Sequence, residues 1–329
     1  EHTYVMSADD RTGKVNISQT HDVDAANLKT GAIYSLAVQG TDLAGNVNSV
    51  SKNNIRYDNV KPAFGAVTPA ASSKVGPASR QVAWTNSEIL LSGAVGYVWT
   101  GNGTVDGASP HVTALSGGNL TAGAKTADVA GLVDGSEYTL QLTSTDLAGN
   151  AADAVNVNGI VYDSTPPAFG TLTPATGSRT NAATRRVYWS NSEQLANGEV
   201  KYARTSGTAD SASPHTVNLA TALKLASGAQ NVDVSGLVDG STYTLNISGT
   251  DIAGNTNAPA GNTNISYDIT SPTFGSVTPI VNAIVNATSG QVKFTLSEAL
   301  ASARLAYTAV TSVGGEASGT PHNRDLTGA

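Results

Sequence analysis

The sequence lacks cysteine and has few charged or aromatic residues, and these shortages limit the sites and the secondary structure that it can form. With no cysteine among 329 residues, neither a disulfide framework nor a thiolate metal site can form. Only 13% of residues are charged and 5% are aromatic, which favours short strands and turns over amphipathic helices. The sequence has no apolar run of about 18 residues, so nothing predicts insertion into a membrane.

The charge balance narrows the choice of partners. The net charge is -7, and the densest basic patch is the pair Arg185 and Arg186. Nucleic-acid binding depends on clustered Lys and Arg, so this balance argues against a nucleic-acid partner and favours cations. The sequence also lacks the GxSxG turn that exposes a nucleophilic serine, and we expect no enzymatic activity.

The sequence repeats with a period of about 105 residues. A Pro-rich joint ends at Phe64, Phe169 and Phe274, which are spaced by 105 residues. A unit of this length is too long for a solenoid repeat and close to the size of one β-sandwich, so each should have its own core. The predicted boundaries of the first to fourth repeats are 1–62 (strands E to G), 63–167 and 168–272 (both complete), and 273–329 (strands A to C or C′).

Short β-branched segments predict the strands of the second repeat. They are 80–88 for strand B, 94–101 for C, 110–115 for C′ or D, 125–132 for E, 136–146 for F and 154–163 for G. Tyr138, Leu140 and Leu142 alternate with polar residues, so strand F should bury one face. "DLAGN" then predicts a hairpin turn, with Gly149 and Asn150 able to take positive φ.

Two segments carry a resemblance to known domains. "LVDGSEYTLQLTSTDLAGN" and "LVDGSTYTLNISGTDIAGN" resemble the E–F corner and strand F of fibronectin type III and related bacterial immunoglobulin-like domains. In those families a tyrosine hydroxyl bonds backbone a few residues upstream and closes the corner. The positions that match family aromatics are Tyr34, Tyr138 and Tyr243 at the corner, Trp84, Trp189 and Phe294 in strand B, and Tyr97, Tyr202 and Tyr307 in strand C.

This resemblance implies an all-β chain of tandem seven-stranded Ig-like (fibronectin type III-like) β-sandwiches, arranged as beads on a string. The joint "YDSTPP" is similar to joints between tandem domains of large bacterial surface adhesins and filaments, which implies an extracellular location at the cell surface or in a secreted filament. The two half repeats have two explanations. The chain is a segment of a longer array, or successive subunits complete each other head to tail.

Acidic residues recur at matched places in the repeats. In this topology the B–C and F–G loops lie where strand A begins, so the linker from the preceding repeat meets both loops. The predicted clusters are Asp58 with Glu88 and Asp146, Asp163 with Glu193 and Asp251, and Asp268 with Glu298 and a turn beyond residue 329. Carboxylates, linker carbonyls and water approach the six to eight or so oxygen ligands of Ca²⁺, so we predict calcium between the repeats.

Simpler roles also fit these residues. An Asp before a Gly-Asn turn often forms an Asx-type turn, and the Asp of "YDST" can cap local backbone amides without metal. His111, His215 and His322 each follow a proline, and one His per repeat with no Cys nearby suits loop packing better than metal binding.

Together these features predict the non-catalytic rod of an extracellular bacterial adhesin or surface filament, with joints stiffened by cations. The expected partners are like subunits or continuing repeats of the same chain, and host or surface glycans or proteins. Two alternatives are glycan-binding accessory modules of a secreted hydrolase and a self-assembling fibre subunit completed head to tail. Trp99 is the aromatic residue best placed to stack on a sugar, although its equivalents are Arg204 and Ala309.

Overall fold

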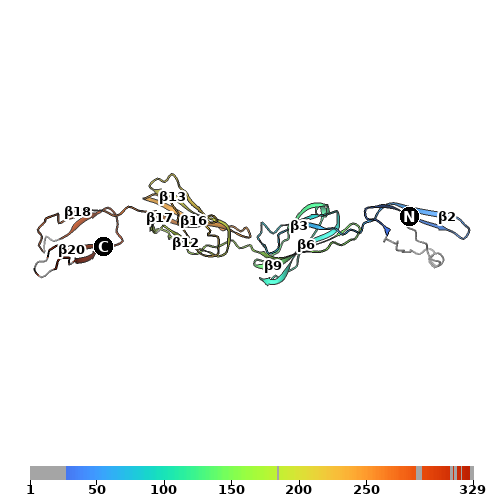
Figure 1. The fold of residues 1–329 in the computed structure, drawn as a ribbon, viewed down its shortest axis with the longest axis horizontal. Helices are drawn as coiled ribbons and strands as arrows, with labels where there is room; N and C mark the ends of the chain where they lie inside the picture. The colour runs from blue at the N-terminus through green and yellow to red at the C-terminus, as the bar shows by residue number, and fades with distance from the viewer. Residues whose placement is uncertain are drawn as a thin grey trace.

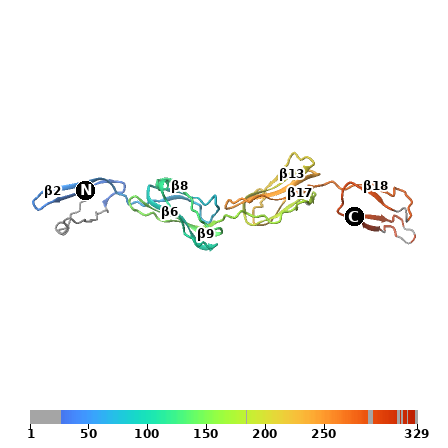
Figure 2. The same cartoon turned by 180° about the vertical axis from the view of Figure 1, so that it is seen from behind.

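The computed structural model describes residues 27–183, 185–286, 291–311, 314, 317–319 and 321–326. These residues form β-strands and turns, with a short 3-10 helix at Gly117–Leu120. They contain no helix long and apolar enough to cross a membrane. Figure 1 shows the repeats in a row, with the first and fourth at opposite ends, and the view from behind in Figure 2 shows the same order.

The second repeat is a sandwich of two sheets. The first sheet has the order β3 (Phe64–Thr68), β5 (Val82–Asn86) and β8 (Gly123–Ala127). The other has the order β4 (Lys74–Val75), β10 (Val155–Tyr162), β9 (Ser136–Asp146), β6 (Leu90–Gly103) and β7 (His111–Ala114). All these pairings are antiparallel except that of β4 with β10.

The strands predicted for this repeat are present, although strand E spans Gly123–Ala127 and not the predicted 125–132. Strand F has the predicted bounds, and β7 pairs with β6, which makes the segment after Pro110 strand C′ rather than D. Strand C runs longer than predicted because its ladder with β9 continues through two bulges. In the F–G turn Gly149 has φ of +94°, but Asn150 does not take positive φ; its backbone and side-chain nitrogens both donate to Asp146.

The third repeat has the same plan. Its larger sheet has the order β11 (Arg179–Thr180), β17 (Ala260–Tyr267), β16 (Ser241–Asp251), β13 (Leu195–Gly207) and β14 (His215–Asn218). The opposite sheet pairs β12 (Val187–Asn191) with β15 (Gly228–Val232). Two isolated bridges, Phe169 to Asn191 and Thr173 to Tyr188, stand in the place of strand A.

The first and fourth repeats contribute three strand pairs in the described residues. In the first repeat β1 (Ile33–Thr41) pairs with β2 (Val47–Arg56). In the fourth repeat β18 (Phe274–Thr278) pairs with β19 (Lys293–Leu296), and β20 (Ala303–Thr308) pairs with β21 (Pro321–Leu326).

Each complete repeat has its own core around a buried tryptophan. Trp84 is 2% exposed, and its indole N–H donates a 2.7 Å hydrogen bond to Oδ1 of Asn86. The Asn86 amide in turn donates to two backbone carbonyls at 2.9 Å. The buried indole N–H of Trp84 and the buried amide of Asn86 thus both have hydrogen-bond partners inside the sandwich. Trp189 and Asn191 repeat this pair, and the two cores form separate clusters.

The predicted tyrosine corner is confirmed and carries an additional carboxylate. The hydroxyl of buried Tyr138 accepts a hydrogen bond from the backbone N–H of Val133 and donates one to Oδ2 of Asp106, at 2.9 and 2.6 Å. Nε2 of His111 contacts the same oxygen at 2.6 Å, so His111 packs beneath the corner. Burial opposes ionisation of Asp106, but the hydrogen bonds from Tyr138 and His111 outweigh it and lower the pKa of the carboxyl.

We expect Tyr138→Phe to lower the free energy of unfolding of the second repeat by about 1–3 kcal/mol, because Val133 N–H and Asp106 would each lose a buried partner. The third repeat should unfold as before, since its core is separate. Calorimetric unfolding of the whole chain would show one shifted transition and one unchanged. The half-exposed Tyr188→Phe is the control, and a shift of all transitions together would contradict independent cores.

Candidate metal-binding joints between repeats

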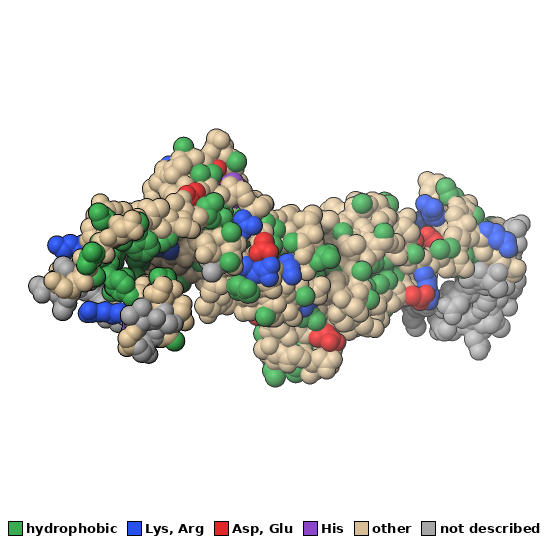
Figure 3. All heavy atoms as spheres, turned by 60° about the vertical axis from the view of Figure 1, so that its left-hand side comes forward, with side chains coloured by type: hydrophobic (Ala, Val, Ile, Leu, Met, Phe, Trp, Pro, Cys, Tyr) green, Lys and Arg blue, Asp and Glu red, His purple; other side chains and the backbone are tan. Residues whose placement is uncertain are grey.

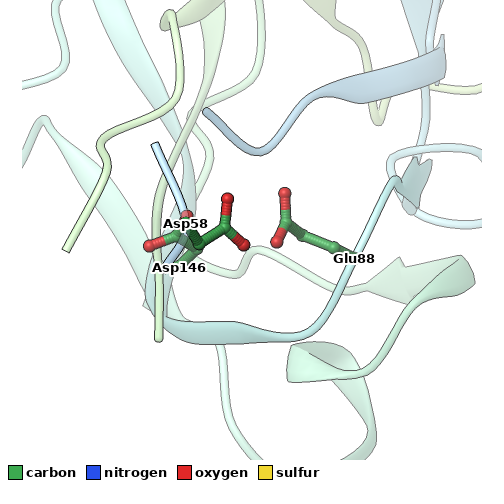
Figure 4. A group of neighbouring side chains, drawn as sticks. All are labelled: Asp58, Glu88 and Asp146. Carbon is green, nitrogen blue, oxygen red and sulfur yellow. The ribbon is translucent and has the colours of Figure 1, made fainter. Parts of the chain in front are cut away.

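Three carboxylates meet where the first repeat joins the second. Asp58 lies in the linker between β2 and β3, Glu88 follows β5, and Asp146 is the last residue of β9. One carboxylate oxygen from each lies within 4.8 Å of the others. In Figure 4 the Glu88 side chain points toward the two aspartates from the opposite side. The structure thus brings together the residues that the sequence placed in one cluster.

The F–G turn fixes the position of Asp146. Its Oδ1 accepts hydrogen bonds from the backbone N–H groups of Ala148 and Asn150, at 2.8 and 2.9 Å, and its Oδ2 accepts one from the Asn150 amide. The interpretation of Asp146 as a turn former is therefore correct. It is compatible with metal binding, because an oxygen of the same side chain still faces the cluster.

The linker is tied to this turn. The Asn150 amide also donates to the backbone carbonyl of Asp58, at 3.2 Å, so one side chain joins the turn to the linker. Asp58 itself accepts a hydrogen bond from the backbone N–H of Val60, at 3.1 Å, as the local-capping role predicts. Two carboxylates of the cluster are thus placed before any ion binds.

The electrostatics of the cluster favour a cation. Partial burial, together with the negative charges of Asp58 and Asp146, raises the pKa of Glu88, which Arg56 offsets only in part. Asp146 behaves differently, because hydrogen bonds from Asn150 and from the turn amides outweigh the effect of burial and lower its pKa. Of these two carboxylates, Glu88 is therefore the one whose ionised form the site disfavours.

The joint between the second and third repeats has the same construction. Asp163, Glu193 and Asp251 each offer an oxygen within 4.8 Å of the others. Asp251 closes its turn through Gly254 and Asn255, and the Asn255 amide donates to the carbonyl of Asp163 at 2.9 Å. Burial and the two aspartate charges raise the pKa of Glu193.

A lysine distinguishes the second joint from the first. Lys74, on β4 of the second repeat, places its Nζ 3.3 Å from Oδ2 of Asp163 and 3.8 Å from Oε2 of Glu193. It lowers the pKa of Glu193 and so opposes the effect of the aspartates. Part of the negative charge at this joint is thus already compensated by the protein.

The second joint also contains direct contacts between repeats. The carbonyl of Ala253, in the F–G turn of the third repeat, accepts hydrogen bonds from Gly76 N–H at 3.1 Å and Ser79 Oγ at 2.9 Å. A Cβ on Gly76 would lie 2.8 Å from that carbonyl oxygen, so this approach requires glycine. Asp134 accepts hydrogen bonds from Ser164 and Thr165, which fixes the linker from the other side.

The remaining candidate residues do not form a third such group. No cluster of three metal-ligating side chains around Asp268 and Glu298 occurs in the part of the chain that the structure describes. Asp268 accepts a hydrogen bond from the backbone N–H of Thr270 at 3.1 Å, which is local capping. For these two residues, as for the other six carboxylates, a role as metal ligands stays a prediction.

Sequence reasoning missed the residues that hold the carboxylates in place. Asn150 and Asn255 follow the turn aspartate by four residues, and Asn46 does so in the first repeat, where it bonds Asp42 in the same way. That fixed spacing in "DLAGN" and "DIAGN" was a usable signal. Lys74 offered no signal, because nothing in the sequence shows that β4 ends beside the next repeat.

The geometry suits a hard cation with oxygen ligands. Two ligands of one Ca²⁺ lie no more than about 5 Å apart, since each Ca–O distance is about 2.5 Å, and the three carboxylate oxygens meet that limit. Both clusters could therefore hold a metal ion. Without one, each joint gathers three carboxylates, and burial together with the two aspartate charges raises the pKa of its glutamate.

Comparison with known proteins shows no family and finds solved structures of low similarity. No family model and no curated protein matches this sequence. Similar solved structures include the chicken CNTN1 FN1-FN3 domains, with a TM-score of 0.32 and 10% identity over 69% of this chain and 76% of that one. The fibronectin(III)-like modules of CbhA from Clostridium thermocellum give 0.31 and 8%, over 62% and 95%. Dimeric latent PorU from Porphyromonas gingivalis gives 0.23 and 13%, over 71% and 27%. The strand order of the second and third repeats by itself shows two β-sandwiches in tandem.

We expect Glu88→Gln to stabilise the second repeat at pH 7 when divalent cations are absent. The fold raises the pKa of Glu88, so its ionisation destabilises the joint above that raised pKa, and the cost disappears below the ordinary value. The gain in Tm should therefore be full at pH 7 and vanish near pH 4. Thermal unfolding in EDTA at both pH values measures it.

Asp146→Asn provides the opposite case. The pKa of Asp146 is lowered, so its ionised form stabilises the fold above its ordinary pKa, and the variant should lose stability at pH 7. If both variants shifted the Tm in the same direction, repulsion centred on Glu88 would be the wrong account.

Proposed function

We propose that this chain is a non-catalytic rod segment of an extracellular bacterial adhesin or surface filament, whose joints are stiffened by Ca²⁺. The observation that carries the proposal is the repetition of one acidic joint. Linker aspartate, B–C glutamate and F–G aspartate meet at two successive joints, and an Asn amide ties linker to turn at both. A cation bound there would connect two repeats through ligands from both sides of the joint.

The same repetition argues against catalysis. A catalytic carboxylate pair is not normally copied at every joint of a repeat array. Here the two clusters have the same members on the same elements, and in both the glutamate has the raised pKa. Repeated geometry at successive joints suits a mechanical element.

Trp99 gives little support to sugar stacking. Its indole N–H donates to the carbonyl of Asn102 at 2.8 Å, and its side chain packs against the core of the second repeat. The rod is therefore the better-supported hypothesis. Its immediate partners would be like subunits or further repeats, and a surface glycan or protein would be contacted elsewhere in the assembly. Protease treatment of intact cells, followed by mass spectrometry of the released peptides, tests the extracellular location.

We expect Ca²⁺ to stabilise the chain and to keep it extended. An ion that binds only the folded joint contributes about 2.7 kcal/mol when its concentration is a hundredfold above Kd. Calorimetric titration should give one ion per described cluster, and small-angle scattering should show a shorter particle in EDTA than in Ca²⁺. Asp163→Asn with Glu193→Gln should remove one ion and the corresponding part of the Tm increase.

The matched control removes two carboxylates outside the second joint. Asp153 and Glu199 lie outside both clusters, where they pair with Lys61 and Lys201, so Asp153→Asn with Glu199→Gln removes the same formal charge and leaves all six cluster carboxylates in place. It should bind as many ions as the parent chain. If both double variants bound the same number of ions, the effect of calcium would be general charge screening. The second joint would then not be a calcium site.

Lys74 offers a test of competition at the second joint. Since its ammonium lies beside Asp163 and Glu193, a bound ion must displace it or share the carboxylates with it. We expect Lys74→Met to raise Ca²⁺ affinity at this joint several-fold and to leave the first joint unchanged. Calorimetric titration in which the first joint is blocked by Glu88→Gln isolates the effect, and an unchanged affinity would show that the lysine does not compete.

A further inference from the structure

The tip of the F–G turn in the third repeat does not face water. Ala253 lies between β16 and β17 and is 2% exposed, whereas Ile252 beside it is 49% exposed. Turns normally lie on the surface, where water satisfies their backbone groups. The carbonyl of Ala253 instead faces the second repeat, from which it accepts two hydrogen bonds. In Figure 3 the two central repeats are in contact, with no gap on the face that the view presents.

Residues 76–79, the A–B loop of the second repeat, receive this carbonyl. The two donors are the backbone N–H of Gly76, at 3.1 Å, and Oγ of Ser79, at 2.9 Å. The serine oxygen also accepts a hydrogen bond from Gly76 N–H at 2.8 Å, so the donors are held beside each other. The loop closes through the N–H of Arg80, which donates to the carbonyl of Gly76 at 3.0 Å. Bonds inside the second repeat therefore order both donors.

The contact leaves no room for a side chain on residue 76. An added Cβ would lie 2.8 Å from the carbonyl oxygen of Ala253, 3.0 Å from Oδ1 of Asn255 and 3.1 Å from the carbonyl oxygen of Asp163. All three oxygens belong to the linker or to the third repeat. Gly76 does not have the positive φ that favours glycine in turns. The need for glycine therefore comes from the contact between repeats.

The third repeat shows that the loop itself folds without glycine. Its equivalent of Gly76, 105 residues later, is Asn181. The N–H of Arg185 donates to the carbonyl of Asn181 at 3.0 Å, which is the same closing bond. The Asn181 side chain also accepts a hydrogen bond from Ala183 N–H at 2.9 Å. An asparagine is thus compatible with the loop but not with a turn docked at the distance seen in the second repeat.

The linker between the two repeats is held from both sides. On the second repeat, Asp134 accepts hydrogen bonds from the hydroxyls of Ser164 and Thr165, at 2.9 and 2.8 Å. On the third repeat, the Asn255 amide donates to the carbonyl of Asp163 at 2.9 Å. None of these bonds involves an ion.

We propose that the second and third repeats form one rigid unit, in which the A–B loop of the second repeat is the docking site for the F–G turn of the third. Neighbouring domains move relative to each other unless their interface prevents it. Here the docked turn and the doubly held linker fix separate points of the joint, and separate points determine an angle where one alone would be a pivot. The protein thus sets this angle without a bound ion.

This inference goes beyond the proposed function and does not rest on calcium or on an extracellular location. An ion in the second acidic cluster would strengthen a joint whose geometry already exists. Any shortening of the particle in EDTA would then arise elsewhere in the chain.

Distances between spin labels on the two repeats test the proposal. The chain has no cysteine, so Gln141→Cys on β9 and Thr216→Cys on β14 place labels at two exposed strand positions only. Pulsed electron paramagnetic resonance of the full labelled chain gives the distribution of label distances. We expect a narrow distribution whose width is the same in EDTA and in Ca²⁺.

Two variants of the A–B loop should loosen the joint. Gly76→Asn introduces the residue of the third repeat, so the loop should fold while the turn is displaced, and we expect the distribution in EDTA to widen several-fold. Ser79→Ala removes one donor without filling space and should widen it less. The matched control is Gly107→Asn, because an added Cβ there would meet nothing within 4 Å. It should keep the parent width.

Two results would overturn the proposal. A distribution that is broad for the parent chain in EDTA and narrow in Ca²⁺ would mean that the ion sets the angle. Equal narrow distributions for the parent chain and Gly76→Asn would mean that the docked turn does not. Calorimetry counts bound calcium separately, so failure of the docking site and failure of the calcium joint are distinguishable.

Discussion

The F–G turn, closed by its own aspartate, determines how one repeat meets the next. Asp146 accepts hydrogen bonds from Ala148 and Asn150, and the free end of Asn150 reaches the carbonyl of the linker. The same bonds recur around Asp251 and Asn255. Because one short motif forms the turn and also holds the incoming linker, the position of the linker aspartate follows from the local structure of the turn.

This arrangement concentrates negative charge where one repeat joins the next. Two of the three carboxylates accept hydrogen bonds, whereas burial and the two aspartate charges together raise the pKa of the glutamate after strand B. The two joints offset this rise differently. Lys74 enters the second joint, where Gly76 and Ser79 also contact the following repeat directly. The first joint has no such lysine contact in the described residues, and there Arg56 offsets the raised pKa of Glu88 only in part.

The complete repeats and the end repeats follow the same rules with different outcomes. In the complete repeats two sheets enclose a tryptophan whose N–H is bonded to an asparagine two residues later. In the fourth repeat Phe294 and Leu296 replace that pair, and an aromatic ring without an N–H needs no acceptor. The strand pairs of the fourth repeat have the same registers as the equivalent pairs of the complete repeats. Backbone pairing and the period-two pattern of the strands set these registers locally.

The repeat length, the strands of each sandwich and the tyrosine corner can be predicted from the sequence, because they depend on local alternation and on turn residues at fixed spacing. The cluster of Asp58, Glu88 and Asp146 can also be predicted, since the topology of the sandwich brings their loops together. The position of Lys74 within the second acidic joint and the contact of Ala253 with Gly76 emerge only from the folded chain. Those contacts depend on the angle between neighbouring repeats, which is set by packing across the joint and leaves no periodic signal in the chain.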